Sequence, residues 1–165
     1  LVNNAGIWIP EYLSEMSLAK QQGVVDVNLM GTLYCTKHAL PRIKKTSSSV
    51  IINLTSAAAK TNSPGLGLYA ATKAAIETLT RQWALELSPI RVNAVGPGLI
   101  MTEGTAENYR GKARELRANA VPLKRVGDAS DIADVIKFLI SDEARYVNGQ
   151  ILYIDGGLTA GSAGR

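Results

Sequence analysis

The chain has 165 residues, enough for one domain with a substantial hydrophobic core. Its 46% hydrophobic and 19% charged residues exclude a disordered, collagen-like or coiled-coil chain, and no apolar run approaches the roughly 18 residues of a membrane-spanning helix. The formal net charge of +4 comes from scattered basic residues without interleaved aromatic side chains. We therefore expect neither a nucleic-acid partner nor a membrane partner.

The chain opens on Leu1-Val2, which is interpreted as the last part of a β-strand, and a turn of small residues follows. Apolar residues at helical spacing then predict a helix over about residues 17–45, with Pro41 near its end. The single cysteine, Cys35, falls in this helix and is expected to be a small buried side chain. One cysteine leaves no intramolecular disulfide, which favours a reducing, cytoplasmic compartment.

The middle of the chain alternates predicted strands with predicted helices. Val50-Ile51-Ile52-Asn53-Leu54 is a short β-branched run that predicts a strand buried on both faces. Apolar residues at intervals of four or seven predict a helix over about residues 68–87, and residues 90–95 predict the next strand. A more polar helix is expected over about residues 105–120.

The last third of the chain contains the clearest periodicity. Asp128 is predicted to cap a helix whose apolar residues recur at helical spacing, at Ile132, Val135, Ile136, Leu139 and Ile140. Residues 151–154 predict the final strand, and the tail from about residue 159 is expected to be mobile. Strands without polar alternation that alternate with long helices predict an α/β fold with a parallel sheet covered on both faces.

Ligands of such sheets bind beyond the carboxyl ends of the strands. In this chain, the segments that follow predicted strands are residues 3–6, 55–67, 96–102 and 155–157. We therefore expect the chemistry of the protein to reside there.

Tyr69 and Lys73 lie four residues apart at the start of a predicted helix, so both side chains project from one face. A free phenol has a pKa of about 10, and a neighbouring ammonium lowers that pKa. A phenol tuned in this way can protonate a carbonyl oxygen or deprotonate an alcohol. An ordinary amphipathic pair is the alternative interpretation.

Two more polar residues bear on this choice. Ser56 lies two residues beyond a predicted strand, where its hydroxyl could bond a substrate oxygen. Asn28 lies among apolar residues of the preceding helix, and it either serves the site or satisfies backbone groups.

A G-x-G-x-x-A match at residues 65–70 does not follow a strand directly, so a loop that leads into a helix is expected there. His38 has no second ligand at metal-binding spacing, and no metal site is expected.

Together these residues form a set of spaced motifs that resembles the short-chain dehydrogenase/reductase family, in particular its 3-oxoacyl-[acyl-carrier-protein] reductase and carbonyl reductase group. The motifs are, in chain order, Asn3-Asn4-Ala5-Gly6, Asp26-Val27-Asn28, Ile52-Asn53-Leu54-Thr55-Ser56, Tyr69-Ala70-Ala71-Thr72-Lys73, Arg91-Val92-Asn93, Pro97-Gly98 with Thr102, Val147-Asn148-Gly149-Gln150 and Asp155-Gly156-Gly157. The resemblance implies a Rossmann-like, doubly wound parallel sheet. This sequence would hold its C-terminal portion, as one partial domain over residues 1–165.

The resemblance also implies a role for each site residue. Tyr69 would be the general acid/base, Lys73 would lower its pKa and hold the nicotinamide ribose, Ser56 would polarise the substrate carbonyl, and Asn28 would anchor a water in a proton relay. The cofactor would be NAD or NADP, and the cofactor-binding residues would be Tyr69 and Lys73 together with Asn4, Ala5, Gly6, Pro97, Gly98, Ile100 and Thr102. Residues 99–120 would form a lid over the substrate.

The family's first half has no counterpart in this sequence, including the T-G-x-x-x-G-x-G turn and the residue that selects NAD or NADP. Two functions are therefore weighed. One is an NAD(P)-dependent oxidoreductase that interconverts a small-molecule carbonyl and an alcohol. The other is a truncated, non-catalytic remnant that acts as a binding or assembly module.

The resemblance further implies a homo-oligomer, either a dimer or a tetramer, in which the two long helices pack against a second subunit. Trp83 and Leu87 are candidates for that contact, and packing in the core explains them equally well. No motif of the chain names a substrate.

Overall fold

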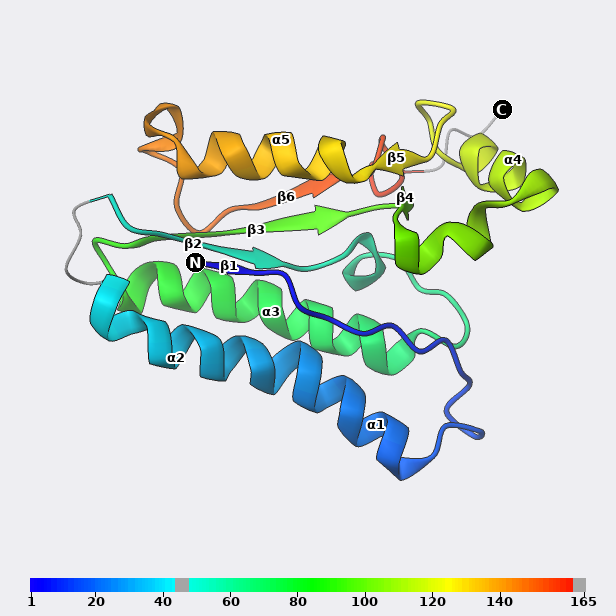
Figure 1. The fold of residues 1–165 in the computed structure, drawn as a ribbon, viewed down its shortest axis with the longest axis horizontal. Helices are drawn as coiled ribbons and strands as arrows, with labels where there is room; N and C mark the ends of the chain where they lie inside the picture. Colours follow the sequence, from blue (N-terminus) through cyan, green and yellow to red (C-terminus); the bar gives the residue numbers. More distant parts are fainter. Residues whose placement is uncertain (44–47, 162–165) are drawn as a thin grey trace.

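The computed structural model describes residues 1–43 and 48–161 and contains a parallel sheet between two layers of helices (Figure 1). The sheet has the order β1 (Val2–Asn3), β2 (Val50–Leu54), β3 (Arg91–Pro97) and β6 (Ile151–Ile154), and every pair in it is parallel. The helices are α1 (Leu18–Val25), α2 (Gly31–Ile43), α3 (Gly67–Glu86), α4 (Gly111–Ala120) and α5 (Ala129–Ile140). A second parallel pair, β4 (Ile100–Met101) and β5 (Gly127–Asp128), is separate from the sheet.

Both faces of the sheet are buried, as the unbroken apolar strands predict. Helices α2 and α3 cover one face and α5 covers the other (Figure 1). Ile51 and Val92 pack with Trp83 on the first face, while Ile52 and Val95 pack on the second. Trp83 therefore belongs to the core, which is one of the two interpretations that its sequence position allowed.

Several elements match their predicted bounds. β2 and β6 begin and end at the predicted residues, and α3 differs from its predicted range by one residue at each end. Asp128 caps α5 in a reciprocal box, in which the Asp131 carboxylate accepts a hydrogen bond from the Asp128 backbone nitrogen at 2.8 Å. The capping residues and the apolar spacing both indicate the same start for this helix, so the sequence alone predicts it.

Two predicted helices differ from the structure. The helix expected over residues 17–45 contains a π-helical turn at Asp26–Met30, between α1 and α2, and residues 44–45 lie outside the described ranges. The polar helix expected over residues 105–120 is a 3-10 segment, Glu103–Tyr109, followed by α4. The two are separated because Arg110 is extended and Gly111 has a φ of +51°. Most of the tail predicted to be mobile, residues 162–165, also lies outside the described ranges.

Cys35 was expected to be buried, and this expectation is wrong, because its side chain is exposed. The face of α2 that is buried carries Thr32 and Thr36 instead. Cys35 immediately precedes Thr36, so it is rotated by about 100° away from that face.

None of the helices in the described ranges has the length and apolar character that a membrane span requires.

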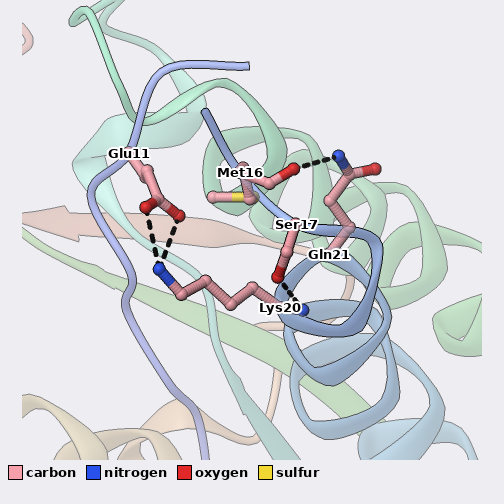
Figure 2. Close-up of polar contacts among 5 residues, drawn as sticks. All are labelled: Glu11, Met16, Ser17, Lys20 and Gln21. Atoms are coloured by element: carbon pink, nitrogen blue, oxygen red, sulfur yellow. Dashed lines mark hydrogen bonds and ion pairs between the residues drawn. The ribbon is translucent and has the colours of Figure 1, made fainter. Parts of the chain in front are cut away.

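Figure 2 shows how polar contacts hold the start of α1. The Ser17 hydroxyl caps the helix by accepting a hydrogen bond from the Lys20 backbone nitrogen at 3.4 Å. Lys20 Nζ also lies 2.8 and 3.0 Å from the two carboxylate oxygens of Glu11. The Glu11 backbone nitrogen in turn donates to the Gly65 carbonyl at 2.9 Å. The loop after β1, which carries Trp8, is thereby tied both to α1 and to the loop before α3.

Gly98 provides a test of the close packing at the end of β3. A Cβ atom at this position would lie 2.6 Å from both the Cα and the Cβ of Asp155. We expect Gly98→Ala to lower the free energy of unfolding by about 1–3 kcal/mol, because backbone atoms must move apart. Urea unfolding measures the effect.

The matched control is Gly104→Ala, since a Cβ there meets nothing within 4 Å. It should change the free energy of unfolding by no more than about 0.5 kcal/mol. Equal midpoints for the two variants would contradict the close approach of Gly98 to Asp155.

Candidate active site

The segments that follow the strands meet at one edge of the sheet, the edge to which the arrows of Figure 1 point. Ser56, beyond β2, and Tyr69, in the first turns of α3, line the same cavity of about 530 Å³. Gly98 and Ile100, beyond β3, line it as well. The predicted convergence of these segments is therefore present in the fold.

Tyr69 and Ser56 interact through their side chains. The Ser56 residue caps a short 3-10 turn, where its Oγ accepts a hydrogen bond from the Ala58 backbone nitrogen at 3.2 Å. Burial raises the pKa of Tyr69, and a side-chain hydrogen bond with Ser56 acts in the opposite direction. We expected Lys73 to lower the pKa of Tyr69, but burial raises this pKa, and the side chain that opposes the rise is that of Ser56.

The position of the Lys73 ammonium explains this difference. Its Nζ lies 5.8 Å from the centroid of the Tyr69 ring and donates a hydrogen bond to the Leu54 carbonyl at 3.0 Å. The side chain is 5% exposed, and burial lowers the pKa of Lys73 to about 8. The Thr55 hydroxyl donates to the Lys73 carbonyl at 2.9 Å, so α3 is fixed at the carboxyl end of β2.

Asn28 lies in the π-helical turn and is 1% exposed. Its Oδ1 accepts a hydrogen bond from the Ile7 nitrogen at 2.7 Å, and its Nδ2 donates to the Ile7 carbonyl at 3.0 Å and to Thr72 Oγ1 at 3.3 Å. The amide therefore satisfies backbone groups, as one of the two interpretations proposed. It also stays next to the site, because a Cβ at Gly6 would lie 3.3 Å from both Asn28 Oδ1 and Lys73 Nζ.

The predicted cofactor-binding residues differ from one another in exposure and in their contacts. Asn4, Ala5 and Gly6 are exposed just beyond β1, and Gly98 follows Pro97 with its nitrogen donating to the Ile154 carbonyl at 3.0 Å. Thr102 is exposed and does not line the cavity. Its hydroxyl lies 3.0 Å from that of Thr105, in a capping box that starts the 3-10 segment.

Sequence reasoning missed a polar pair that involves Glu77, one helical turn beyond Lys73. The Tyr153 hydroxyl on β6 donates to the Glu77 carboxylate, and Glu77 is 6% exposed. Burial, followed by the hydrogen bond to Glu77, raises the pKa of Tyr153. The spacing of Tyr69, Lys73 and Glu77, four residues apart each time, was the available signal for this helix face.

Several cavity residues had no signal in the sequence. Trp8 comes from the loop after β1, Tyr109 ends the 3-10 segment, Arg117 lies on α4 and Leu158 follows β6. They approach Ser56 and Tyr69 only because the chain folds these distant segments together. The cavity thus combines a phenol and a hydroxyl, two groups that can donate and accept protons or hydrogen bonds, with walls that are largely apolar.

Comparison with known proteins gives a consistent result. Residues 1–159 match the family model described as Enoyl-(Acyl carrier protein) reductase. The chain is 43% identical over 160 residues to 3-oxoacyl-[acyl-carrier-protein] reductase FabG of Thermotoga maritima, covering 96% of this chain and 65% of that relative. The chain therefore spans about two thirds of the length of this curated relative.

Solved structures agree with the sequence match. A short-chain dehydrogenase/reductase from Brucella melitensis has a TM-score of 0.90 at 38% identity, and the match covers 95% of this chain and 63% of the Brucella chain. The structure of 4-hydroxyisoleucine dehydrogenase complexed with NADH has a TM-score of 0.91 at 33% identity and covers 98% of this chain and 68% of its own. With a family match over nearly all of its length, the chain belongs to the short-chain dehydrogenase/reductase family.

Proposed function

We propose that this protein is an NAD(P)-dependent oxidoreductase that interconverts a carbonyl and an alcohol on a small molecule. The observation that carries the proposal is the convergence of Ser56 and Tyr69 on one cavity, with the Lys73 ammonium buried behind them. The relatives support it, since one is a reductase and another is a dehydrogenase that binds NADH.

Each site residue has a proposed role. Tyr69 gives a proton to the carbonyl oxygen in reduction and takes it back in oxidation. The Ser56 hydroxyl holds that oxygen, and Lys73, with a pKa of about 8, exchanges protons near neutral pH. Asn28 keeps the Ile7 backbone beside Lys73.

The residues present fit a nicotinamide cofactor. Gly6 leaves the approach to Asn28 and Lys73 open, since a side chain there would crowd both groups at 3.3 Å. Lys73 and Tyr69 would hold the ribose hydroxyls, and Asn4, Ala5, Pro97, Ile100 and Thr102 would border the cofactor. The cofactor supplies or accepts the hydride when bound. The cofactor is NAD or NADP, since none of these residues distinguishes the two.

Residues 99–120 are proposed to close over the substrate as a lid. Leu99, Thr105, Tyr109 and Arg117 from this segment already line the cavity.

We also propose that the protein is cytoplasmic, which agrees with its free cysteine, Cys35, and that it assembles as a homo-oligomer.

Replacing Tyr69 tests the proposed reaction. Tyr69→Phe removes the hydroxyl that transfers the proton, so we expect kcat for carbonyl reduction with NADH or NADPH to fall by at least ~100-fold. The measurement is the loss of cofactor absorbance across a panel of aldehydes and ketones.

Tyr146→Phe removes a fully exposed phenol that does not line the cavity and is the matched control, expected to keep full activity. Unchanged turnover in Tyr69→Phe would overturn the assigned role. A protein that neither turns over any carbonyl nor binds NADH or NADPH would favour the binding or assembly module instead.

The titration of Lys73 supplies a prediction about stability. Burial lowers its pKa from 10.5 in the unfolded chain to about 8 in the folded protein. Between pH 8 and pH 10.5 the unfolded chain binds more protons than the folded protein does. The free energy of unfolding therefore rises with pH in this window, and the gain is lost as pH falls back toward 8. The slope is at most about 1.4 kcal/mol per pH unit.

The experiment is urea unfolding at pH 8, 9 and 10. The free-energy difference between the protein and Lys73→Met should grow with pH. Lys37→Met, which removes an exposed lysine of α2, controls for general effects of the substitution. A difference that stays constant between pH 8 and pH 10 would contradict the buried position of the ammonium.

The oligomer is tested by light scattering on the purified protein. Large apolar side chains are exposed on the helical face away from the sheet, among them Tyr34 at 55% and Leu85 at 76% exposure. Their burial between subunits would stabilise an assembly. We expect the mass of a dimer or a tetramer, and a monomer mass at micromolar concentration would refute the assembly.

A further inference from the structure

The cavity that holds Ser56 and Tyr69 has an asymmetric distribution of charge. Among the described residues that line it, Arg117 is the one whose side chain carries a full charge at neutral pH. The remaining walls are hydroxyl, amide, aromatic and aliphatic groups, including Trp8, Leu66 and Leu158. A cavity that is otherwise neutral and largely apolar therefore has a positive charge at one place.

The guanidinium of Arg117 is fixed within this wall. Its Nη1 donates a hydrogen bond to the Asn108 carbonyl, and its Cζ lies 5.2 Å from the centroid of the Tyr109 ring. Tyr109 is itself 9% exposed, so the ring under the cation is held by the residues packed around it. Contact with an aromatic face and a backbone carbonyl sets the plane of the fork before a ligand arrives.

Arg117 has no carboxylate partner among the residues that the structure describes. The ion pairs found there join Arg110 to Glu107 and Arg125 to Asp131, together with Lys20 and Glu11. A guanidinium has five N–H donors, and the bond to Asn108 uses one of them. A half-buried cation with donors to spare favours an anionic ligand that can pair with two of them at once.

We infer that the substrate carries an anionic group in addition to its reactive carbonyl, and that Arg117 binds this group. The inference rests on the proposed oxidoreductase function and names its substrate class. The carbonyl would lie against Ser56 and Tyr69, an apolar spacer would contact the aliphatic and aromatic walls, and a carboxylate or phosphate would pair with Arg117. A cavity of about 530 Å³ has room for a carbonyl group, such a spacer and an anionic group.

The test compares matched pairs of charged and neutral carbonyl compounds. Acetoacetate and 4-oxopentanoate are assayed against their methyl esters, and dihydroxyacetone phosphate against dihydroxyacetone. We expect kcat/KM to favour the charged member of at least one class by roughly 10- to 100-fold, mainly through KM, because the pair with Arg117 is a charge-assisted hydrogen bond. The carboxylate and phosphate arms show which anion is preferred.

Substitutions in α4 test whether Arg117 causes the preference for charged compounds. Arg117→Ala should lower kcat/KM for the charged compounds more than for the neutral esters, so that the ratio between them falls toward one. Arg117→Gln keeps the length of the side chain in case the smaller variant folds poorly. Arg114→Ala removes an exposed arginine of the same helix and should change nothing. Equal rates for charged and neutral members in the unaltered protein would overturn the inference while leaving the oxidoreductase function intact.

A binding measurement keeps the two proposals separable. If no compound is turned over, the proposed function fails, and calorimetric titration with 4-oxopentanoate and its methyl ester then decides about Arg117 alone. Tighter binding of the acid that is lost in Arg117→Gln and kept in Arg114→Ala supports the anion site. Equal binding of acid and ester, or no binding of either, overturns it.

Discussion

The bonds between α3 and the carboxyl end of β2 fix the position on which the rest of the site depends. Lys73 Nζ donates to the Leu54 carbonyl, and the Thr55 hydroxyl donates to the Lys73 carbonyl. Leaving a buried polar group without its partner costs about 1–3 kcal/mol, so α3 cannot slide or rotate without a large loss of stability. Because Tyr69 lies one helical turn before Lys73, these bonds also set the place of the phenol in the cavity.

A second set of buried amides extends this arrangement across the sheet. Asn3 Nδ2 donates to Asn53 Oδ1 at 2.8 Å and to Thr36 Oγ1 at 2.9 Å, and Asn53 Nδ2 donates to Thr80 Oγ1 at 2.9 Å. The polar side chains of β1 and β2 are therefore paired with specific positions of α2 and α3. An apolar sheet alone permits many registers, whereas these bonds are satisfied in one of them.

The sequence was informative where local and global preferences agree. β2 and β6 could be predicted because each is a short apolar run bounded by polar or turn residues. Ser56 could be proposed as a site residue because it follows a strand end, and Tyr69 because it lies four residues before Lys73 on a helix. The π-helical turn at Asp26–Met30 could not be predicted, because apolar residues of an ordinary helix already recur at steps of both three and four, so one extra residue leaves no separate signal. Arg117 could not either, since α4 carries other basic residues and only the folded chain brings one of them against Tyr109.

The wide turn at Asp26–Met30 also determines where this chain tolerates insertion and deletion. One residue fewer in that turn would leave a continuous α-helix but would rotate everything after it by about 100°. Thr32 and Thr36 would then leave the face that meets the sheet, and Asn3 would lose its partner on α2. A single-residue deletion here is therefore equivalent to displacing a whole helix, whereas one in an exposed loop is absorbed locally.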